Sequence, residues 1–191
     1  SIGFLAGENA PVIWRGPMLH GVIRQFLSDV KWGALDYLVL DRPPGTGDAV
    51  LSLSQSVPLS GAVVVTTPQD VALIDVMKAI EMFKAVKVPV VGIVENMAGF
   101  TCPKCGTMTR IFLEGAGRKA AEKFGIPLLG TLPLDAAVPP GGDHGTPILV
   151  EAPGGFHEQV GVALGDRAHA RGLAGLEAEL ALAPDGQGVD G

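Results

Sequence analysis

The two cysteines of the chain, Cys102 and Cys105, stand two residues apart in the stretch CPKCG. This spacing is typical of a metal-binding turn, in which two thiolates converge on one ion, yet a closed tetrahedral site needs four such ligands. A thioredoxin-like redox pair is less favoured, because such a pair opens a helix after an early strand and this one lies in a Gly- and Thr-flanked loop. Two incidental free thiols are the remaining alternative. The pair therefore predicts half of a metal site.

A second candidate for chemistry is the end of the apolar run DYLVLD (36–41), where Asp41 is followed by a Pro/Gly loop. A carboxylate in this position lies close to Mg²⁺ in P-loop NTPases, and the N–H groups of Gly45 and Gly47 could bind a terminal phosphate. Taken alone, such a loop is more often an ordinary turn.

Two further apolar runs end in polar residues. Asn96 follows VPVVGIVE, and its amide could read the edge of a nucleobase, although an Asn after a strand is usually a turn residue. Pro133 and Asp135 end the run PLLGTLPLD and could equally be loop residues. Because ligands bind beyond the carboxyl ends of strands in open parallel sheets, these positions are candidate ligand contacts.

The elements that must hold these residues are predicted by the periodicity of apolar positions. Short continuous apolar runs predict buried strands at 36–41, 61–67, 88–96 and 127–133. Helical spacing predicts helices from Met18 to Val30, after an N-cap at Thr67, over 117–125 and over 156–173. Strands that alternate with helices indicate an α/β fold, with a parallel sheet covered by helices on both faces.

Composition limits the class of protein. The 191 residues are 47% hydrophobic and 18% charged, which fits one compact domain, and no apolar run approaches the ~20 residues of a membrane span. The net charge of −6 argues against nucleic acid as a partner, because phosphate-binding surfaces need clustered Lys and Arg. Two cysteines make no disulfide framework, which favours a reducing, cytoplasmic compartment.

Five stretches taken together resemble the Mrp/ApbC family of iron-sulfur carrier P-loop ATPases over roughly residues 1–160. They are VIWRGPM (12–18), DYLVLDRPPGTGD (36–48), TTPQDVALIDVMKAI (66–80), GIVENMAGFTCPKCG (92–106) and GTLPLDAAVPPGGDHGTP (130–147). The resemblance implies a SIMIBI-type P-loop NTPase fold and an ATP-dependent carrier that delivers iron-sulfur clusters to apo iron-sulfur proteins.

The resemblance also implies roles for particular residues. Asp41 would be the Walker B-type carboxylate near Mg²⁺, and the loop with Pro44, Gly45 and Gly47 would sense the nucleotide. Asn96 and the loop from Pro133 to Asp135 would contact the adenine nucleoside of ATP. Cys102 and Cys105 would be cluster ligands. Since a [4Fe-4S] cluster takes four thiolates, a two-fold homodimer would complete the site with two copies of the pair.

The phosphate loop of the family is not found in this sequence. That loop ends in G-K-[ST], and none of the seven lysines follows a glycine. We therefore expect residues 1–175 to form the C-terminal part of such an ATPase domain, without its first strand, and residues 176–191 to be a disordered tail. ATP hydrolysis by this chain alone is not expected. The alternative function is a non-catalytic zinc-binding dimerisation module.

Overall fold

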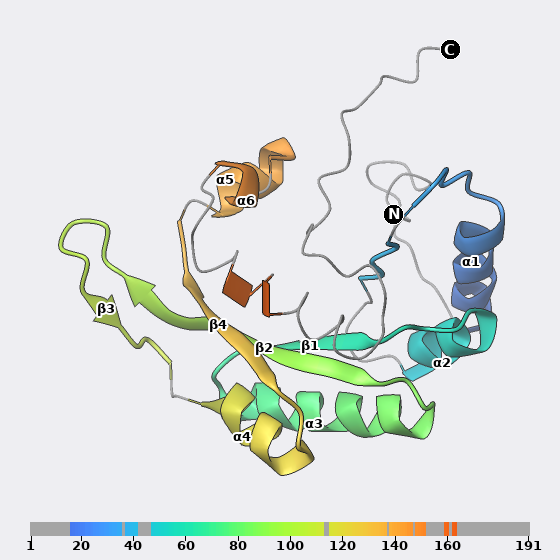
Figure 1. Ribbon diagram of the computed structural model, residues 1–191, viewed down its shortest axis with the longest axis horizontal. Coiled ribbons are helices and arrows are strands. Elements are labelled where there is room, and N and C mark those ends of the chain that lie inside the picture. Colours follow the sequence, from blue (N-terminus) through green and yellow to red (C-terminus); the bar gives the residue numbers. More distant parts are fainter. Residues whose placement is uncertain are drawn as a thin grey trace. The chain divides into compact units, whose positions relative to one another are not determined.

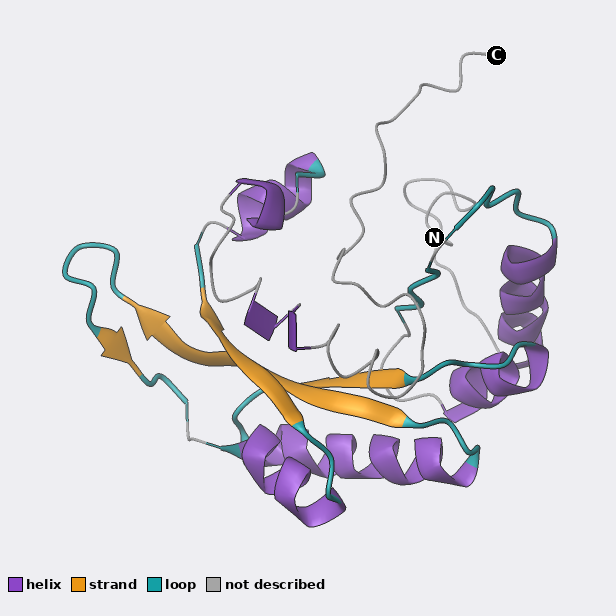
Figure 2. Cartoon of the chain, viewed as in Figure 1, coloured by secondary structure: helices purple, strands orange, loops and turns teal. Residues whose placement is uncertain are grey.

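The computed structural model describes residues 16–35, 37–41, 47–112, 115–136, 138–146, 148–151, 159–160 and 162–163. The chain divides into two compact units, Ser1–Leu59 and Ser60–Gly191. The first unit contains helices α1 (Gly16–Ser28) and α2 (Gly47–Ser56). Figures 1 and 2 show the elements of the second unit, which are β1 (Ala62–Thr66), α3 (Asp70–Ala85), β2 (Val90–Thr101), β3 (Met108–Thr109), α4 (Ala116–Phe124), β4 (Leu128–Leu134), α5 (Val138–His144) and α6 (Ile148–Glu151).

In the first unit, α1 confirms the helix predicted from Met18, and it packs against α2. The indole N–H of Trp32 donates a 2.8 Å hydrogen bond to the carbonyl of Phe26, which ties the segment after α1 back to the helix. Helix α2 was not predicted, because the sequence suggested only a glycine-rich loop around Gly47. Val50, which is buried, gives this short helix an apolar anchor.

The strand predicted over 36–41 is wrong for residues 37–41, which the structure describes without regular secondary structure. Their side chains are largely exposed, and Val39 reaches 79%. An apolar run becomes a buried strand only when a neighbouring strand satisfies its backbone groups, and no described strand pairs with this segment. The strand formers in DYLVLD therefore do not decide its structure locally.

The described strands of the second unit form a four-stranded sheet. Strands β1 and β4 both run parallel to the central strand β2, while β3 pairs with the far end of β2 in antiparallel fashion. The predicted α/β class is confirmed, and the sheet is mixed rather than wholly parallel. Strand β2 is also longer than predicted, because its continuation past Asn96 gains β3 as a partner.

The core of this unit lies between the sheet and helices α3 and α4, which cover one face (Figure 1). Ile80 of α3, Ile93 of β2 and Ala120 of α4 are fully buried there. The opposite face carries Gly130, whose lack of a side chain leaves room for Val160: a Cβ added at Gly130 would lie 2.6 Å from a Val160 methyl group. The apolar strands are thus packed from both sides in this part of the sheet.

Helix α3 does not begin as predicted. Its N-cap is Gln69, which is extended and makes no side-chain capping bond, so the assignment of Thr67 as N-cap is wrong. Gln69 is extended, with φ −72° and ψ 141°, so the helix begins only at Asp70 and Pro68 lies before its first turn. Asp70 instead pairs with Lys119 of α4, with 3.1 Å between the carboxylate oxygen and Nζ.

Helix α4 ends where the sequence predicted. Gly125 adopts the left-handed conformation, with φ 64°, and its N–H donates to the last carbonyls of the helix. Most of the helix predicted over 156–173, and the whole tail predicted at 176–191, lie outside the described residues. No described helix combines the length and the apolar character that crossing a bilayer requires.

Candidate metal and nucleoside sites

The cysteines lie at the tip of the hairpin that joins β2 to β3 (Figure 1). The backbone N–H of Cys102 donates to the Thr107 carbonyl at 3.0 Å, and the N–H of Gly106 donates to the Cys102 carbonyl at 2.8 Å. Gly106 has φ 71°, a conformation that only glycine adopts readily. These two bonds close a tight turn around the cysteines. The turn predicted from CPKCG is therefore present.

The two thiols differ in environment. Cys102 is half-buried and Cys105 is exposed. The Thr107 hydroxyl lies 3.3 Å from Cys105 Sγ. Hydrogen bonds from this hydroxyl and from the Thr107 backbone, followed by one from Cys102, lower the pKa of Cys105 because they stabilise its thiolate. The thiolate is the form that binds metals, so the turn prepares Cys105 as a ligand.

No third ligand joins this pair in the described part of the chain. No group of three or more His, Cys, Asp or Glu side chains is placed there to hold a metal ion. The hairpin therefore offers two thiolates per chain, as the spacing predicted.

A second candidate site lies at the carboxyl ends of the parallel strands. Asn96 of β2 stands opposite Leu132 of β4, which brings it next to Pro133. Asp135 follows directly after β4 and is exposed. The fold thus brings Asn96 beside Pro133, whereas Asp135 follows the pairing of Leu134 with Phe100 further along β2. The Asn96 side-chain oxygen accepts a 2.9 Å hydrogen bond from the N–H of Met97, which orients the amide.

The remaining candidate residues belong to the first unit. Asp41 is exposed and lies in a segment without regular structure, and Gly47 is the first residue of α2. Pro44 and Gly45 lie outside the described residues. Their proposed role around Mg²⁺ and the phosphates stays a prediction.

Glu95 is a residue that the sequence analysis missed. It is only 5% exposed, and its Oε2 accepts a 2.7 Å hydrogen bond from the N–H of Gly117 in the first turn of α4. A carboxylate at this end of a helix satisfies a free N–H and interacts favourably with the helix dipole. Gly117 is required for the contact, since a Cβ there would lie 3.0 Å from Glu95 Oε2. Glu95 thereby fixes α4 beside Asn96.

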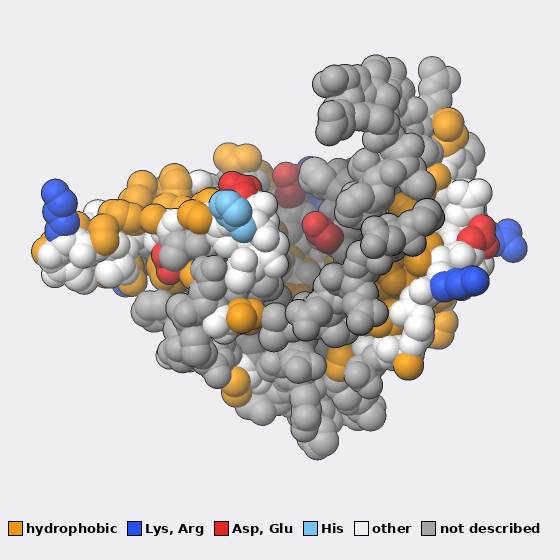
Figure 3. All heavy atoms as spheres, turned by 90° about the horizontal axis from the view of Figure 1, so that it is seen from above, with side chains coloured by type: hydrophobic (Ala, Val, Ile, Leu, Met, Phe, Trp, Pro, Cys, Tyr) orange, Lys and Arg blue, Asp and Glu red, His pale blue; other side chains and the backbone are white. Residues whose placement is uncertain are grey.

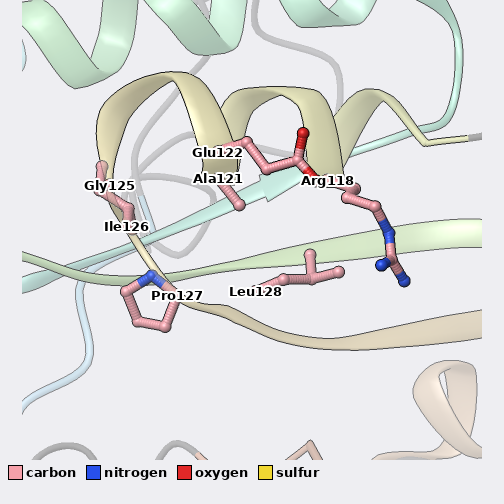
Figure 4. Close-up of a pocket in the computed structure, with 7 residues that line it drawn as sticks. All are labelled: Arg118, Ala121, Glu122, Gly125, Ile126, Pro127 and Leu128. Carbon is pink, nitrogen blue, oxygen red and sulfur yellow. The ribbon is translucent and has the colours of Figure 1, made fainter.

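A shallow hollow of about 580 Å³ lies between the end of α4 and the start of β4 (Figure 4). Its lining includes Pro127 and Leu128, with Arg118 and Glu122 as the charged members. It adjoins the amino end of β4, whereas Pro133 and Asp135 lie at the carboxyl end. The hollow is therefore separate from the candidate nucleoside contacts.

The fold of the chain is that of known P-loop ATPases. The cell-division ATPase MinD from Pyrococcus furiosus shares it, with a TM-score of 0.56 and 22% identity over 84% of this chain and 63% of that one. A nucleotide-binding protein from Archaeoglobus fulgidus, solved in complex with ADP, has a TM-score of 0.62 and 44% identity over 73% of this chain and 56% of that one.

The model of the ParA family, described as NUBPL iron-transfer P-loop NTPase, matches residues 1–164. The chain therefore belongs to this family. The predicted resemblance to the Mrp/ApbC carriers is thereby confirmed. The chain is 54% identical to an iron-sulfur cluster carrier protein from Synechocystis, over 80% of this chain and 44% of that protein. It is 50% identical to the iron-sulfur cluster transfer protein NUBPL of Mus musculus, over 81% of this chain and 48% of that protein. The chain thus spans about half the length of these curated relatives.

Proposed function

We propose that the chain is part of an ATP-dependent iron-sulfur cluster carrier of the cytoplasm. In this proposal two copies of the chain hold one [4Fe-4S] cluster between them, each through Cys102 and Cys105. The cluster is cargo, and apo iron-sulfur proteins receive it. The names of relatives with up to 54% identity support the carrier function.

The observation that carries the proposal is the two-thiolate hairpin. A cluster with four thiolate ligands can be completed by a second copy of the same hairpin on a two-fold axis. The tip of the hairpin is accessible, since Cys105 is exposed.

The nucleotide part of the proposal is supported by the neighbouring positions of Asn96 and Pro133 at the ends of β2 and β4. Ligands of open α/β sheets bind beyond these strand ends. The Archaeoglobus fulgidus protein, which was solved with ADP, shares this fold at 44% identity. Asp41, Pro44, Gly45 and Gly47 would act on Mg²⁺ and the phosphates of ATP in the whole protein.

The metal site is tested by anaerobic reconstitution of the purified chain with ferrous iron and sulfide. We expect about two iron atoms per chain, visible thiolate-to-iron absorption and a mass of two chains by light scattering. Cys102→Ser and Cys105→Ser should each lose the iron and the dimer while keeping the far-UV signal. Thr109→Ser, on exposed β3, is the matched control and should load normally.

Two results would decide against this cluster site. A monomer that holds a full cluster would exclude the shared site, and iron retained by both serine variants would exclude the cysteines as ligands. If the chain takes up Zn²⁺ in a dimer but no cluster, the zinc-binding dimerisation module is the better description, because the same four sulfurs suit tetrahedral Zn²⁺.

The nucleoside contacts are tested by adding ADP to the isotope-labelled chain and recording amide shifts by NMR. We expect shifts concentrated at Asn96 and at Leu132 to Asp135, and their loss in Asn96→Ala. Shifts confined to the hollow beside Pro127 would overturn this assignment.

A further inference from the structure

The hairpin that carries the cysteines differs in charge from the rest of the chain. Residues 96–112 contain Lys104 and Arg110 and no Asp or Glu. The chain as a whole carries a net charge of −6, so the residues outside this segment carry −8. The segment that carries the exposed Cys105 is thus basic and free of acids, within an acidic protein.

Exposed apolar side chains accompany these charges. Met108 on β3 is 49% exposed and Ile111, shortly after it, is 53% exposed. Lys104 lies between the two cysteines at the tip and is exposed, and no ion pair joins it to a described residue. We call Lys104, Met108, Arg110 and Ile111 the hairpin surface. Seen from above, the tip of the hairpin presents a basic side chain, with hydrophobic side chains along the adjoining surface (Figure 3).

The chemistry of cluster transfer determines where a recipient protein must bind. The cysteines of a recipient have to reach the iron atoms that Cys102 and Cys105 hold, so the recipient must dock on the residues around these thiols. Lys104 lies between the two thiols in the sequence, and Met108, Arg110 and Ile111 follow on and after β3. The rest of the chain carries a net negative charge and on average repels an acidic partner, whereas the positively charged hairpin attracts it. This distribution of charge directs an approaching acidic protein to the hairpin.

We propose that the hairpin surface is the docking surface for the cluster recipient, and that the recipient presents an acidic surface with apolar residues around its own ligand cysteines. The inference rests on the proposed carrier function. In the exchange, each bond from iron to a carrier thiolate breaks as a bond to a recipient thiolate forms. The cluster keeps its charge and oxidation state, and the proton leaving each recipient thiol ends on a released carrier thiol.

A second copy of the chain is the other candidate for this surface. Two copies around a shared cluster would bring like charges together, because each contributes Lys104 beside the thiols. Only the negative charge of the cluster offsets that repulsion, and it does so close to the metal. Charge complementarity therefore favours an acidic recipient over a second copy as the partner of the wider surface.

The test is transfer from the cluster-loaded chain to an apoferredoxin that takes a [4Fe-4S] cluster and has an acidic isoelectric point. The circular dichroism of the recipient's cluster measures the rate. Lys104→Glu should slow transfer about tenfold at low salt, and raising the salt concentration should slow the unmodified chain towards the same rate. Lys78→Glu is the matched control, since Lys78 is an exposed lysine of α3 with the same change of charge. It should transfer at the unmodified rate.

Cluster loading is measured before transfer, so the two hypotheses fail separately. If the chain does not load, the carrier function fails, and direct binding of the unloaded chain to the apoferredoxin still tests the docking surface by the same variants. If Lys104→Glu loads fully and transfers at the unmodified rate, the docking proposal is overturned. Equal slowing by Lys78→Glu would also overturn it, because the effect would then be that of net charge alone.

Discussion

The two halves of strand β2 show how differently one strand can be held. From Val90 to Glu95 every residue is buried, with β1 on one side and β4 on the other. After Asn96 the pairing with β4 loses its regular register, and Met97 adopts a left-handed φ of 58° that is unusual for its type. The strand then continues into the hairpin, where β3 contributes only two residue pairs. Burial fixes the first half, and local hydrogen bonds fix the second.

This difference separates stability from chemistry along a single strand. Changes in the first half should lower the free energy of unfolding without altering the thiols. Changes in the hairpin should alter the thiols with little effect on the free energy of unfolding.

The largest effect is expected for Ile93→Ala. Ile93 is fully buried at the centre of the sheet, and removing three of its side-chain carbons leaves a cavity that should cost about 2–5 kcal/mol of unfolding free energy. Urea unfolding followed by far-UV circular dichroism measures the loss. Val65→Ala, on β1 with 60% exposure, is the control and should cost under about 0.5 kcal/mol. Similar losses for both would mean that burial does not distinguish the two positions.

A smaller loss is expected when Glu95 no longer binds Gly117. Glu95→Ala leaves the Gly117 N–H buried without its acceptor and should cost about 1–3 kcal/mol. Glu95→Gln keeps an acceptor oxygen and should recover part of the lost free energy of unfolding, because the Gly117 N–H again has an acceptor. The same urea series measures both variants. If glutamine is no better than alanine, the hydrogen bond is not what holds α4.

In the hairpin, Gly106→Ala should cost about 1–2 kcal/mol of local stability, because alanine is strained at φ 71°. No neighbouring atom obstructs an added Cβ, so the effect is one of backbone conformation alone. Amide hydrogen exchange at Cys102 and Gly106 should quicken while the exchange of Ile93 stays slow. Gly142→Ala, which has neither positive φ nor a close neighbour, should leave exchange in the hairpin unchanged. Faster exchange throughout the sheet would contradict a local role.

The sequence predicted those features whose causes are local. The apolar runs predicted β1 and β4, the spacing of apolar residues predicted α3, and the helix predicted over 117–125 agrees with α4 to within one residue at each end. The cysteine spacing likewise predicted the tight turn at the hairpin tip.

The features that the sequence did not predict depend on contacts between residues far apart in the chain. The contact between Glu95 and Gly117 joins residues 22 positions apart, so the sequence around Glu95 does not predict it. The segment 36–41 failed as a strand for the same reason, because its apolar pattern says nothing about whether a neighbour is present to pair with it. Two features could have pointed to Glu95: its place directly after a buried run, and the small Gly117 at the start of a helix.

The smallest change in structure is expected from Thr107→Val, which replaces the hydroxyl beside Cys105 with a methyl group of similar size. The hydroxyl stabilises the thiolate, so its removal should raise the pKa of Cys105 towards the ordinary value of a thiol. The rate of alkylation by iodoacetamide, measured against pH in a Cys102→Ser background so that one thiol reacts, should then reach its midpoint at a higher pH. At neutral pH the variant should react more slowly than its parent, because less of the thiol is ionised. Thr109→Val, two residues further along the hairpin, should leave the midpoint unchanged, as should Ile93→Ala in the buried half of β2. A midpoint that stays fixed in Thr107→Val, or moves to lower pH, would show that the hydroxyl does not support the thiolate, and would leave the backbone of the turn as the source of the lowered pKa.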